Sequence, residues 1–134
     1  MSALSPKSGG CHCGAVAWQA DLADRVTAEA CNCSICERTG YLHVIVPRSR
    51  FRLLRGHENL TSYRWNTGVA EHLFCRVCGV KSFYVPRSNP DGVSLNLRCM
   101  DRGQFAGVEL SDFDGRNWEA SAPRLAGLSD EAGA

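Results

Sequence analysis

Three short clusters of cysteine constrain this chain more than any other feature of its sequence. The clusters are Cys11-His12-Cys13-Gly14, Cys31-Asn32-Cys33-Ser34-Ile35-Cys36 and Cys75-Arg76-Val77-Cys78-Gly79. Because they hold seven of the eight cysteines, composition alone does not explain the pattern. Thiolates bind zinc tetrahedrally, and ligands that are close in sequence reach one ion without ordering a long loop. The clusters therefore predict zinc sites.

The length and charge of the chain narrow its class. With 134 residues, of which 44% are hydrophobic and 22% charged, the chain suits one compact domain. A formal net charge of +1 and a pI near 7.6 provide no general attraction to nucleic acid, so a nucleic-acid partner is not expected. Neither property indicates an oligomeric state.

The distribution of apolar residues predicts a cytoplasmic protein. The first ten residues contain no apolar run that could form the core of a signal peptide, and no later segment approaches the roughly 20 apolar residues of a membrane span. In the reducing cytosol, cysteines more often ligate metals or act in catalysis than form disulfides. The alternative, a disulfide-rich secreted module, is disfavoured because it requires a signal peptide.

The segments between the clusters read mostly as short strands. Apolar and β-branched runs predict strands at residues 15–20, 26–31, 42–46, 51–54, 60–65, 80–85 and 93–97, those between residues 42 and 65 forming a β meander. One helical turn is expected at residues 34–38, closed by Thr39-Gly40, with its N–H groups near anionic sulfur. We expect a flexible N-terminal tail (1–8), a zinc-binding domain (9–126) and a flexible C-terminal tail (127–134).

Several sequence blocks carry a resemblance to a known family. They are Gly9-Gly10-Cys11-His12-Cys13-Gly14-Ala15-Val16, Cys31-Asn32-Cys33-Ser34-Ile35-Cys36, Ile45-Val46-Pro47, Tyr63-Arg64-Trp65-Asn66-Thr67, Phe74-Cys75-Arg76-Val77-Cys78-Gly79-Val80-Lys81-Ser82-Phe83-Tyr84, Pro86-Arg87-Ser88-Asn89-Pro90 and Arg98-Cys99-Met100-Asp101. In these blocks the sequence resembles the glutathione-dependent formaldehyde-activating enzyme (GFA) family, and within it the branch that includes centromere protein V. The blocks are specific for the family, but not for one reaction.

The resemblance implies a fold and two metal sites. The fold is mostly β, a single domain of small coiled antiparallel sheets clamped by two zinc ions. When the ligands of the family are transferred to the matching positions of this sequence, one structural site consists of Cys11, Cys13, Cys75 and Cys78. The other, with an open fourth position, consists of Cys31, Cys33 and Cys36. Spacing alone does not sort the thiols in this way, although two pairs can close one tetrahedron and a triplet leaves a vacancy.

The two sites should differ in chemistry. Four thiolates leave no room for a substrate, whereas three leave one exchangeable position where an incoming thiol can lose its proton and act as a nucleophile. The resemblance then implies a carbon–sulfur lyase type of reaction, in which glutathione or a related small thiol adds to formaldehyde to give S-(hydroxymethyl)glutathione. On this hypothesis the catalytic residues are Cys31, Cys33 and Cys36.

Three alternatives stay open at this point. The triplet can be a second structural site, completed by Cys99 or a histidine. The protein can be a non-enzymatic zinc-stapled binding module, as the likeness to centromere protein V permits. It can also be a thiol-based redox protein, although zinc would occupy the thiols that must exchange.

A few further residues are candidates for binding. Arg87, in the Pro-Arg-Ser-Asn-Pro turn, is the preferred anchor for an anionic group of the substrate. Arg48, Arg50, Arg52 and Arg55 could bind carboxylates, or form a solvated strand face.

The remaining cysteine and the histidines have less specific interpretations. Cys99 is interpreted as a small buried hydrophobic residue or as a neighbour of the second zinc. His43 and His72 read as structural histidines, either of which could accept a proton from an incoming thiol. His12, between two proposed ligands, should point away from their metal.

Overall fold

The computed structural model describes residues 3–129 and is built mostly from short strands. The strands are β1 (Ser5–Gly10), β2 (Ala17–Leu22), β3 (Arg25–Cys31), β4 (Leu42–Pro47), β5 (Phe51–Arg55), β6 (Leu60–Tyr63), β7 (His72–Cys75), β8 (Phe83–Tyr84), β9 (Gly92–Asn96) and β10 (Gly107–Phe113). The α-helices are α1 (Ser34–Thr39) and α2 (Trp118–Ser121). Turns of 3₁₀ helix cover Arg48–Arg50, His57–Asn59, Leu97–Cys99, Arg102–Gln104, Gly115–Asn117 and Ala122–Leu125. Neither α-helix has the length or apolar character needed to cross a bilayer.

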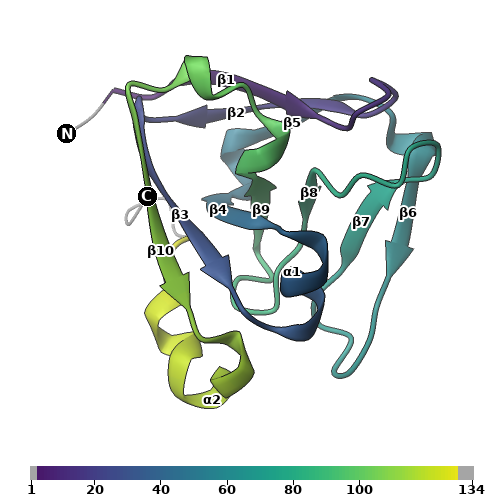
Figure 1. Ribbon diagram of the computed structural model, residues 1–134. Coiled ribbons are helices and arrows are strands. Elements are labelled where there is room, and N and C mark those ends of the chain that lie inside the picture. The colour runs from purple at the N-terminus through teal and green to yellow at the C-terminus, as the bar shows by residue number, and fades with distance from the viewer. Residues whose placement is uncertain (1–2, 130–134) are drawn as a thin grey trace.

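The strands form three sheets (Figure 1). Their strand orders are β1-β2-β5, β10-β3-β4-β9-β8 and β6-β7. The expected antiparallel pairing holds throughout, with one exception: β10 runs parallel to β3. β10 is not among the strands predicted from the sequence, although Val108-Glu109-Leu110-Ser111 alternates between apolar and polar residues.

The predicted β meander between residues 42 and 65 is wrong. β4, β5 and β6 follow one another along the chain, but each belongs to a different sheet. After Pro47 a 3₁₀ turn redirects the chain, so that β5 pairs with β2 and not with β4. The apolar side chains of β5 thereby reach the first sheet, where Phe51 packs against Trp18 at a ring-centroid distance of 5.8 Å.

Trp18 joins the first sheet to the rest of the core. Its side chain is completely buried, and its indole N–H donates to the hydroxyl of Ser82 at 3.1 Å. The backbone of Gly9 packs against the indole ring, and a Cβ atom at this position would come within 2.3 Å of a ring carbon. The core around it also contains Val16, Ala20, Leu22, Ala28, Leu42, Val44, Val46, Phe83, Val93, Leu95, Leu97 and Met100. This core fixes the strands from which both cysteine-rich loops project.

The two predicted tails are partly structured. Residues 5–8, expected to be flexible, pair with β2, and Lys7 forms an ion pair with Asp24 at 2.7 Å. Ser129 is buried, where it accepts a hydrogen bond from Asn89 and donates one to Asp91. Residues 5–8 and Ser129 therefore have defined contacts, whereas residues 1–2 and 130–134 of the expected tails lie outside the described part of the chain.

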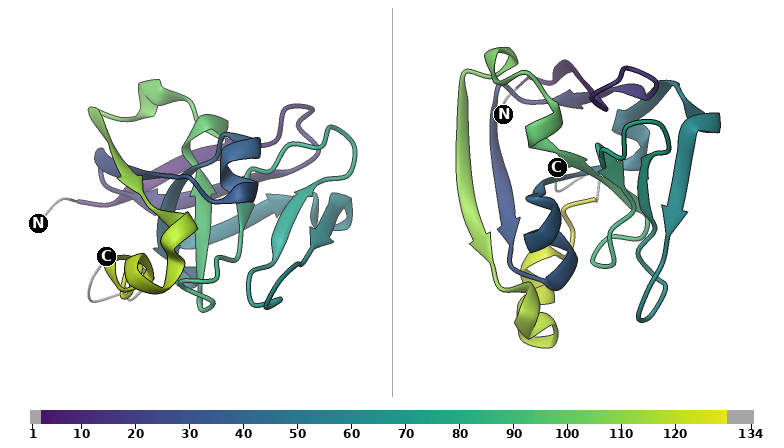
Figure 2. Two further views of the ribbon diagram at one scale, coloured as in Figure 1. Left: turned by 60° about the horizontal axis from the view of Figure 1, so that its bottom comes forward. Right: turned by 45° about the vertical axis from the view of Figure 1, so that its right-hand side comes forward.

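One end of the molecule gathers loops from distant parts of the chain. In Figures 1 and 2, α2 follows β10 on one side and the β6–β7 hairpin lies on the other, with α1 between them. Each of these segments contributes to the site described next.

Candidate metal centres and pocket

The first candidate metal centre joins two loops that are far apart in sequence. Cys11 and Cys13 follow β1, whereas Cys75 ends β7 and Cys78 lies in the turn after it, yet their four sulfur atoms lie within 4.8 Å of one another. The sulfur of Cys13 is 3.7 Å from those of both Cys11 and Cys75. A tetrahedron with Zn–S bonds of about 2.3 Å has edges of about 3.8 Å, so the donor set fits zinc.

The backbone around this centre has the expected knuckle form. Gly14 and Gly79, each directly after a ligand, adopt positive φ angles of 85° and 77°. Backbone N–H groups point at sulfur as a result, that of Val16 at Cys11 (3.3 Å) and that of Val77 at Cys75 (3.4 Å). Such donors stabilise the thiolate form that binds a metal.

The second centre lies where β3 passes into α1. The sulfur atoms of Cys31, Cys33 and Cys36 again lie within 4.8 Å of one another. Hydrogen bonds from the thiols of Cys31 and Cys36, and from the N–H groups of Cys36 and Ile35, lower the pKa of Cys33 to about 2. The same contacts with Cys31 and Cys33 raise the pKa of Cys36. Three thiolates therefore require a cation between them, and this donor set also fits zinc.

No fourth protein ligand joins this trio among residues 3–129. Cys99 does not complete it. Its sulfur belongs to neither cysteine group, and burial, with the charges of Cys11 and Cys78, raises its pKa to about 11. His43 approaches the trio, with Nε2 at 3.1 Å from the sulfur of Cys36, a distance typical of a hydrogen bond and not of metal coordination.

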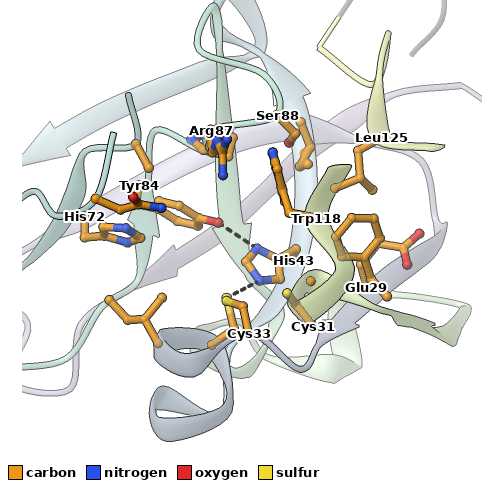
Figure 3. A pocket seen from close by; sticks show the side chains of 18 of the residues that line it. Glu29, Cys31, Cys33, His43, His72, Tyr84, Arg87, Ser88, Trp118 and Leu125 are labelled. Atoms are coloured by element: carbon orange, nitrogen blue, oxygen red, sulfur yellow. Dashed lines mark hydrogen bonds between the residues drawn. The ribbon is translucent and has the colours of Figure 1, made fainter. Parts of the chain in front are cut away.

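His43 is oriented by two hydroxyl groups, of which Figure 3 shows that of Tyr84. Its Nδ1 lies 3.1 Å from Oγ of Ser94 and 3.2 Å from the hydroxyl of Tyr84. Burial, with a further contribution from the charge of Lys81, lowers the pKa of His43 to about 3, so the ring is neutral. Because hydroxyls can donate and a thiolate can only accept, the proton belongs on Nε2, facing Cys36.

The three thiols open into a cavity of about 300 Å³. Its walls come from the β6–β7 loop, from the turn after β8 and from the segment after β10. Figure 3 shows Arg87 and Ser88 of the turn after β8 and Trp118 of the segment after β10. The lining residues include Glu29, Ile35, Ile45, Trp65, Asn66, Thr67, Ala70, His72, Tyr84, Pro86, Arg87, Ser88, Phe113, Gly115, Arg116, Trp118 and Leu125. The volume and largely apolar walls suit a small organic ligand.

Arg87 reaches this cavity, as its loop position predicts. Its guanidinium carbon lies 4.7 Å from the centroid of the Trp118 ring, and its Nη2 is 3.6 Å from a carboxylate oxygen of Glu119. The Glu119 side chain is 90% exposed, so this ion pair is weak and its carboxylate is readily replaced.

The other candidate arginines have roles in the first sheet. Arg52 forms a bidentate ion pair with Asp21 at 2.9 and 3.1 Å, and Arg55 donates to the carbonyl oxygen of Gly14 at 2.9 Å. The arginines at positions 48, 50, 52 and 55 do not line the cavity.

The segment after β10 is the part of the site that sequence reasoning missed. The carbonyl oxygen of Asn32 accepts a hydrogen bond from Arg116 at 2.8 Å, and the Arg116 side chain also pairs with Glu37. Gly115 lies against the second centre, where a Cβ would meet the sulfur of Cys31 at 2.4 Å. The Asp-Gly pair at 114–115 indicates a turn, but nothing local in sequence indicates that it packs on a metal centre.

Comparisons with known proteins agree with this geometry. A crystal structure of a protein from Rhodobacter sphaeroides is similar, with 36% sequence identity, a TM-score of 0.65, and coverage of 78% of this chain and 99% of that one. The sequence model of the glutathione-dependent formaldehyde-activating enzyme family matches residues 6–113, which span both cysteine centres and most of the cavity wall. The chain therefore belongs to the glutathione-dependent formaldehyde-activating enzyme family.

Proposed function

We propose that this protein binds glutathione or a related small thiol in the cavity and catalyses its reversible addition to formaldehyde, a carbon–sulfur lyase type of reaction. The observation that carries the proposal is the convergence of Cys31, Cys33 and Cys36 at a cavity of small-molecule size, without a fourth protein ligand among residues 3–129. Membership of the family supports the choice of thiol and aldehyde.

The two cysteine centres have different proposed roles. The first, with four thiols, holds one zinc ion and ties the loop after β1 to the turn after β7. The second, with three, holds another. Zinc at the second centre supplies an exchangeable position at which a thiol loses its proton near neutral pH.

The remaining side chains orient the ligand. His43 donates to Cys36 and so holds one ligand sulfur in place. Arg87, supported by the face of Trp118, offers its guanidinium to a carboxylate of the thiol compound in exchange for Glu119. Trp118 and Trp65 cover the cavity from two sides and limit the access of water to the bound thiol.

A non-enzymatic binding module is not favoured as an alternative. Its partner would bind an outer surface, whereas the second centre opens inward to a cavity of about 300 Å³.

The proposal is tested by zinc analysis and glutathione titration of the same sample. We expect two zinc ions per chain and saturable glutathione binding in the wild-type protein. Cys36→Ser should lose glutathione binding and keep its folded circular dichroism spectrum. The matched control is Cys99→Ser, which removes the cysteine outside both centres and should keep two zinc ions and glutathione binding.

Catalysis is measured separately, by NMR exchange between formaldehyde hydrate and the S-hydroxymethyl adduct with and without enzyme. Faster exchange with the wild-type protein is expected. Two zinc ions without any thiol binding, or global unfolding of Cys36→Ser, would contradict the open-site assignment.

A further inference from the structure

A buried lysine stands behind the cavity without a carboxylate partner. Lys81 is only 8% exposed, and no Asp or Glu among residues 3–129 pairs with it. Its ammonium nitrogen lies 3.8 Å from the ring centroid of Tyr84 and 4.9 Å from that of Tyr41. A charged group is costly to bury, and contacts with two aromatic rings offset only part of that cost.

The lysine bonds directly to a histidine of the cavity wall. Nζ of Lys81 lies 2.7 Å from Nδ1 of His72, and the His72 ring stacks on Tyr84 with a centroid distance of 5.0 Å. An ammonium group can only donate, so Nδ1 of His72 accepts and the ring carries its own proton on Nε2.

The remaining nitrogen of His72 faces the cavity. Every fully buried side-chain nitrogen or oxygen in the described part of the chain has a hydrogen-bond partner, and Nε2 of His72 makes no such bond to residues 3–129. This atom is therefore accessible, and the cavity that His72 lines is where it opens. Figure 3 shows the ring beside Tyr84, at the same cavity as the thiols.

We propose that His72 is a catalytic acid that protonates the aldehyde oxygen during thiol addition. Lys81 is the positioning residue: it keeps the proton of His72 on Nε2 before the transfer and gives its own proton to Nδ1 during the transfer. This inference rests on the proposed function, which assigns no residue to the developing alkoxide. A proton donor near that oxygen is needed because addition of a thiolate to a carbonyl generates an alkoxide.

The step balances in atoms and charge. A sulfur electron pair forms the S–C bond, and the π pair of the C=O bond moves to oxygen. Oxygen takes the proton of His72 Nε2 while Nδ1 takes one from Lys81, which becomes a neutral amine. The proton that the thiol released on ionisation enters solvent. After the product leaves, solvent returns one proton to Nε2 of His72 while Nδ1 gives its proton back to Lys81, which restores the starting state. In the reverse direction, cleavage of the adduct, the same groups accept the proton.

The electrostatic surroundings suit both partners. Burial lowers the pKa of Lys81 to about 8, and the thiolates of Cys36, Cys33 and Cys31 oppose this shift. Burial and the charge of Lys81 lower the pKa of His72 to about 4. Lys81 is therefore charged and His72 neutral at pH 7, as the relay requires, and a proton donor with a pKa near the working pH is effective. Besides Lys81 and the thiolates, the surrounding titratable groups are His43, Tyr41, Tyr63 and Tyr84.

The ground-state arrangement is tested first, by long-range ¹H–¹⁵N NMR of the histidine side chains in the zinc-loaded protein at pH 7. We expect His72 as the neutral tautomer protonated on Nε2, and a mixture of tautomers in Lys81→Met. The opposite tautomer, or an imidazolium, in the wild-type protein would overturn the proposal. If Lys81→Met does not fold, Lys81→Arg replaces it and should retain the wild-type tautomer.

The chemical role is tested by exchange NMR with glutathione and formaldehyde as probes. His72→Gln can accept from Lys81 but has no proton to transfer, so we expect exchange to slow roughly 100-fold, or to the uncatalysed rate, at unchanged glutathione affinity. Enzyme-catalysed adduct formation should fall above about pH 8 in the wild-type protein, as Lys81 loses its proton. Lys81→Arg stays charged but cannot give up a proton, so it should slow exchange at every pH and show no fall near pH 8. His57→Gln, on an exposed turn after β5, is the matched control with wild-type behaviour.

The outcomes separate the two proposals. A wild-type protein that does not bind glutathione or accelerate exchange would contradict the proposed function itself. A wild-type protein that does both, with a wild-type rate and pH profile retained in His72→Gln, would reject only the His72–Lys81 relay.

Discussion

The Nε2 atom of His43 lies 3.1 Å from the sulfur of Cys36, while Nδ1 of the same ring contacts the hydroxyls of Ser94 and Tyr84. The ring belongs to β4, and its two hydroxyl partners belong to β9 and β8. The position of one ligand sulfur is therefore set by three neighbouring strands of the five-stranded sheet, and not only by the short helix that contains the cysteine.

Replacing His43 with Phe should weaken zinc binding at the second centre. The phenyl ring fills the same space but cannot donate to the thiolate, and loss of such an outer partner typically costs about 10- to 100-fold in metal affinity. Competition with a chromophoric chelator measures this effect. The affinity of the first centre should be unchanged, because its four ligands are distant in the fold from His43. Equal weakening of both centres would indicate a general loss of folding instead.

Removing the first zinc should unfold the domain. Zinc at a structural site contributes about 10–16 kcal/mol, compared with a total stability of about 5–15 kcal/mol for a typical domain. We expect Cys13→Ser, or a strong chelator, to abolish the cooperative thermal transition. Circular dichroism on heating measures it, with Cys99→Ser as the control. Retention of a sharp transition after complete loss of zinc would show that the hydrophobic core suffices.

Changes at Arg87 and Glu119 should affect glutathione affinity in opposite directions. Arg87→Ala removes the proposed carboxylate anchor and should raise the Kd for glutathione about tenfold, or about 1.4 kcal/mol. Glu119→Gln removes the competing carboxylate and should lower the Kd. Calorimetric titrations at two salt concentrations measure both effects.

An uncharged thiol provides the control for this pair of variants. Binding of 2-mercaptoethanol should be nearly the same in Arg87→Ala, Glu119→Gln and the wild-type protein, because it has no carboxylate. Equal losses for both thiols in Arg87→Ala would mean that Arg87 shapes the cavity without recognising charge.

Gly115→Ala should disturb the second centre from outside the cysteine cluster. The new methyl group would lie 2.4 Å from the sulfur of Cys31 and 3.0 Å from Cβ of Cys33, so one of the two segments must move. We expect weaker zinc binding at this centre and a stability loss of about 1–3 kcal/mol. In Gly103→Ala, the control, the nearest atom is 3.3 Å away, on the side chain of Asp101. Unchanged zinc affinity in Gly115→Ala would show that the segment after β10 can shift freely.

Much of the local structure could be predicted because its causes lie within a few residues. The apolar runs at 26–31, 42–46 and 93–97 correspond to β3, β4 and β9, and the helical turn after Cys33 corresponds to α1. Gly40 ends that helix with a φ of 66°, as the Thr-Gly pair predicts. By contrast, the predicted strand at 80–85 is divided between two partners: Phe83 and Tyr84 pair with β9 as β8, and Val85 forms an isolated bridge with Glu71.

The amino-acid sequence alone specifies three groups of thiols with the spacing of metal ligands. Spacing did not decide which groups share an ion, and the resemblance to the family supplied that division. Tertiary structure decided it physically, by placing Cys13 beside Cys75, 62 residues away. It also decided that Arg87, Trp118 and His72 line one cavity, with Lys81 bonded to His72 behind it. Such contacts depend on how separate sheets pack, and that packing is the sum of many weak contacts between distant segments, which no local pattern of residues encodes.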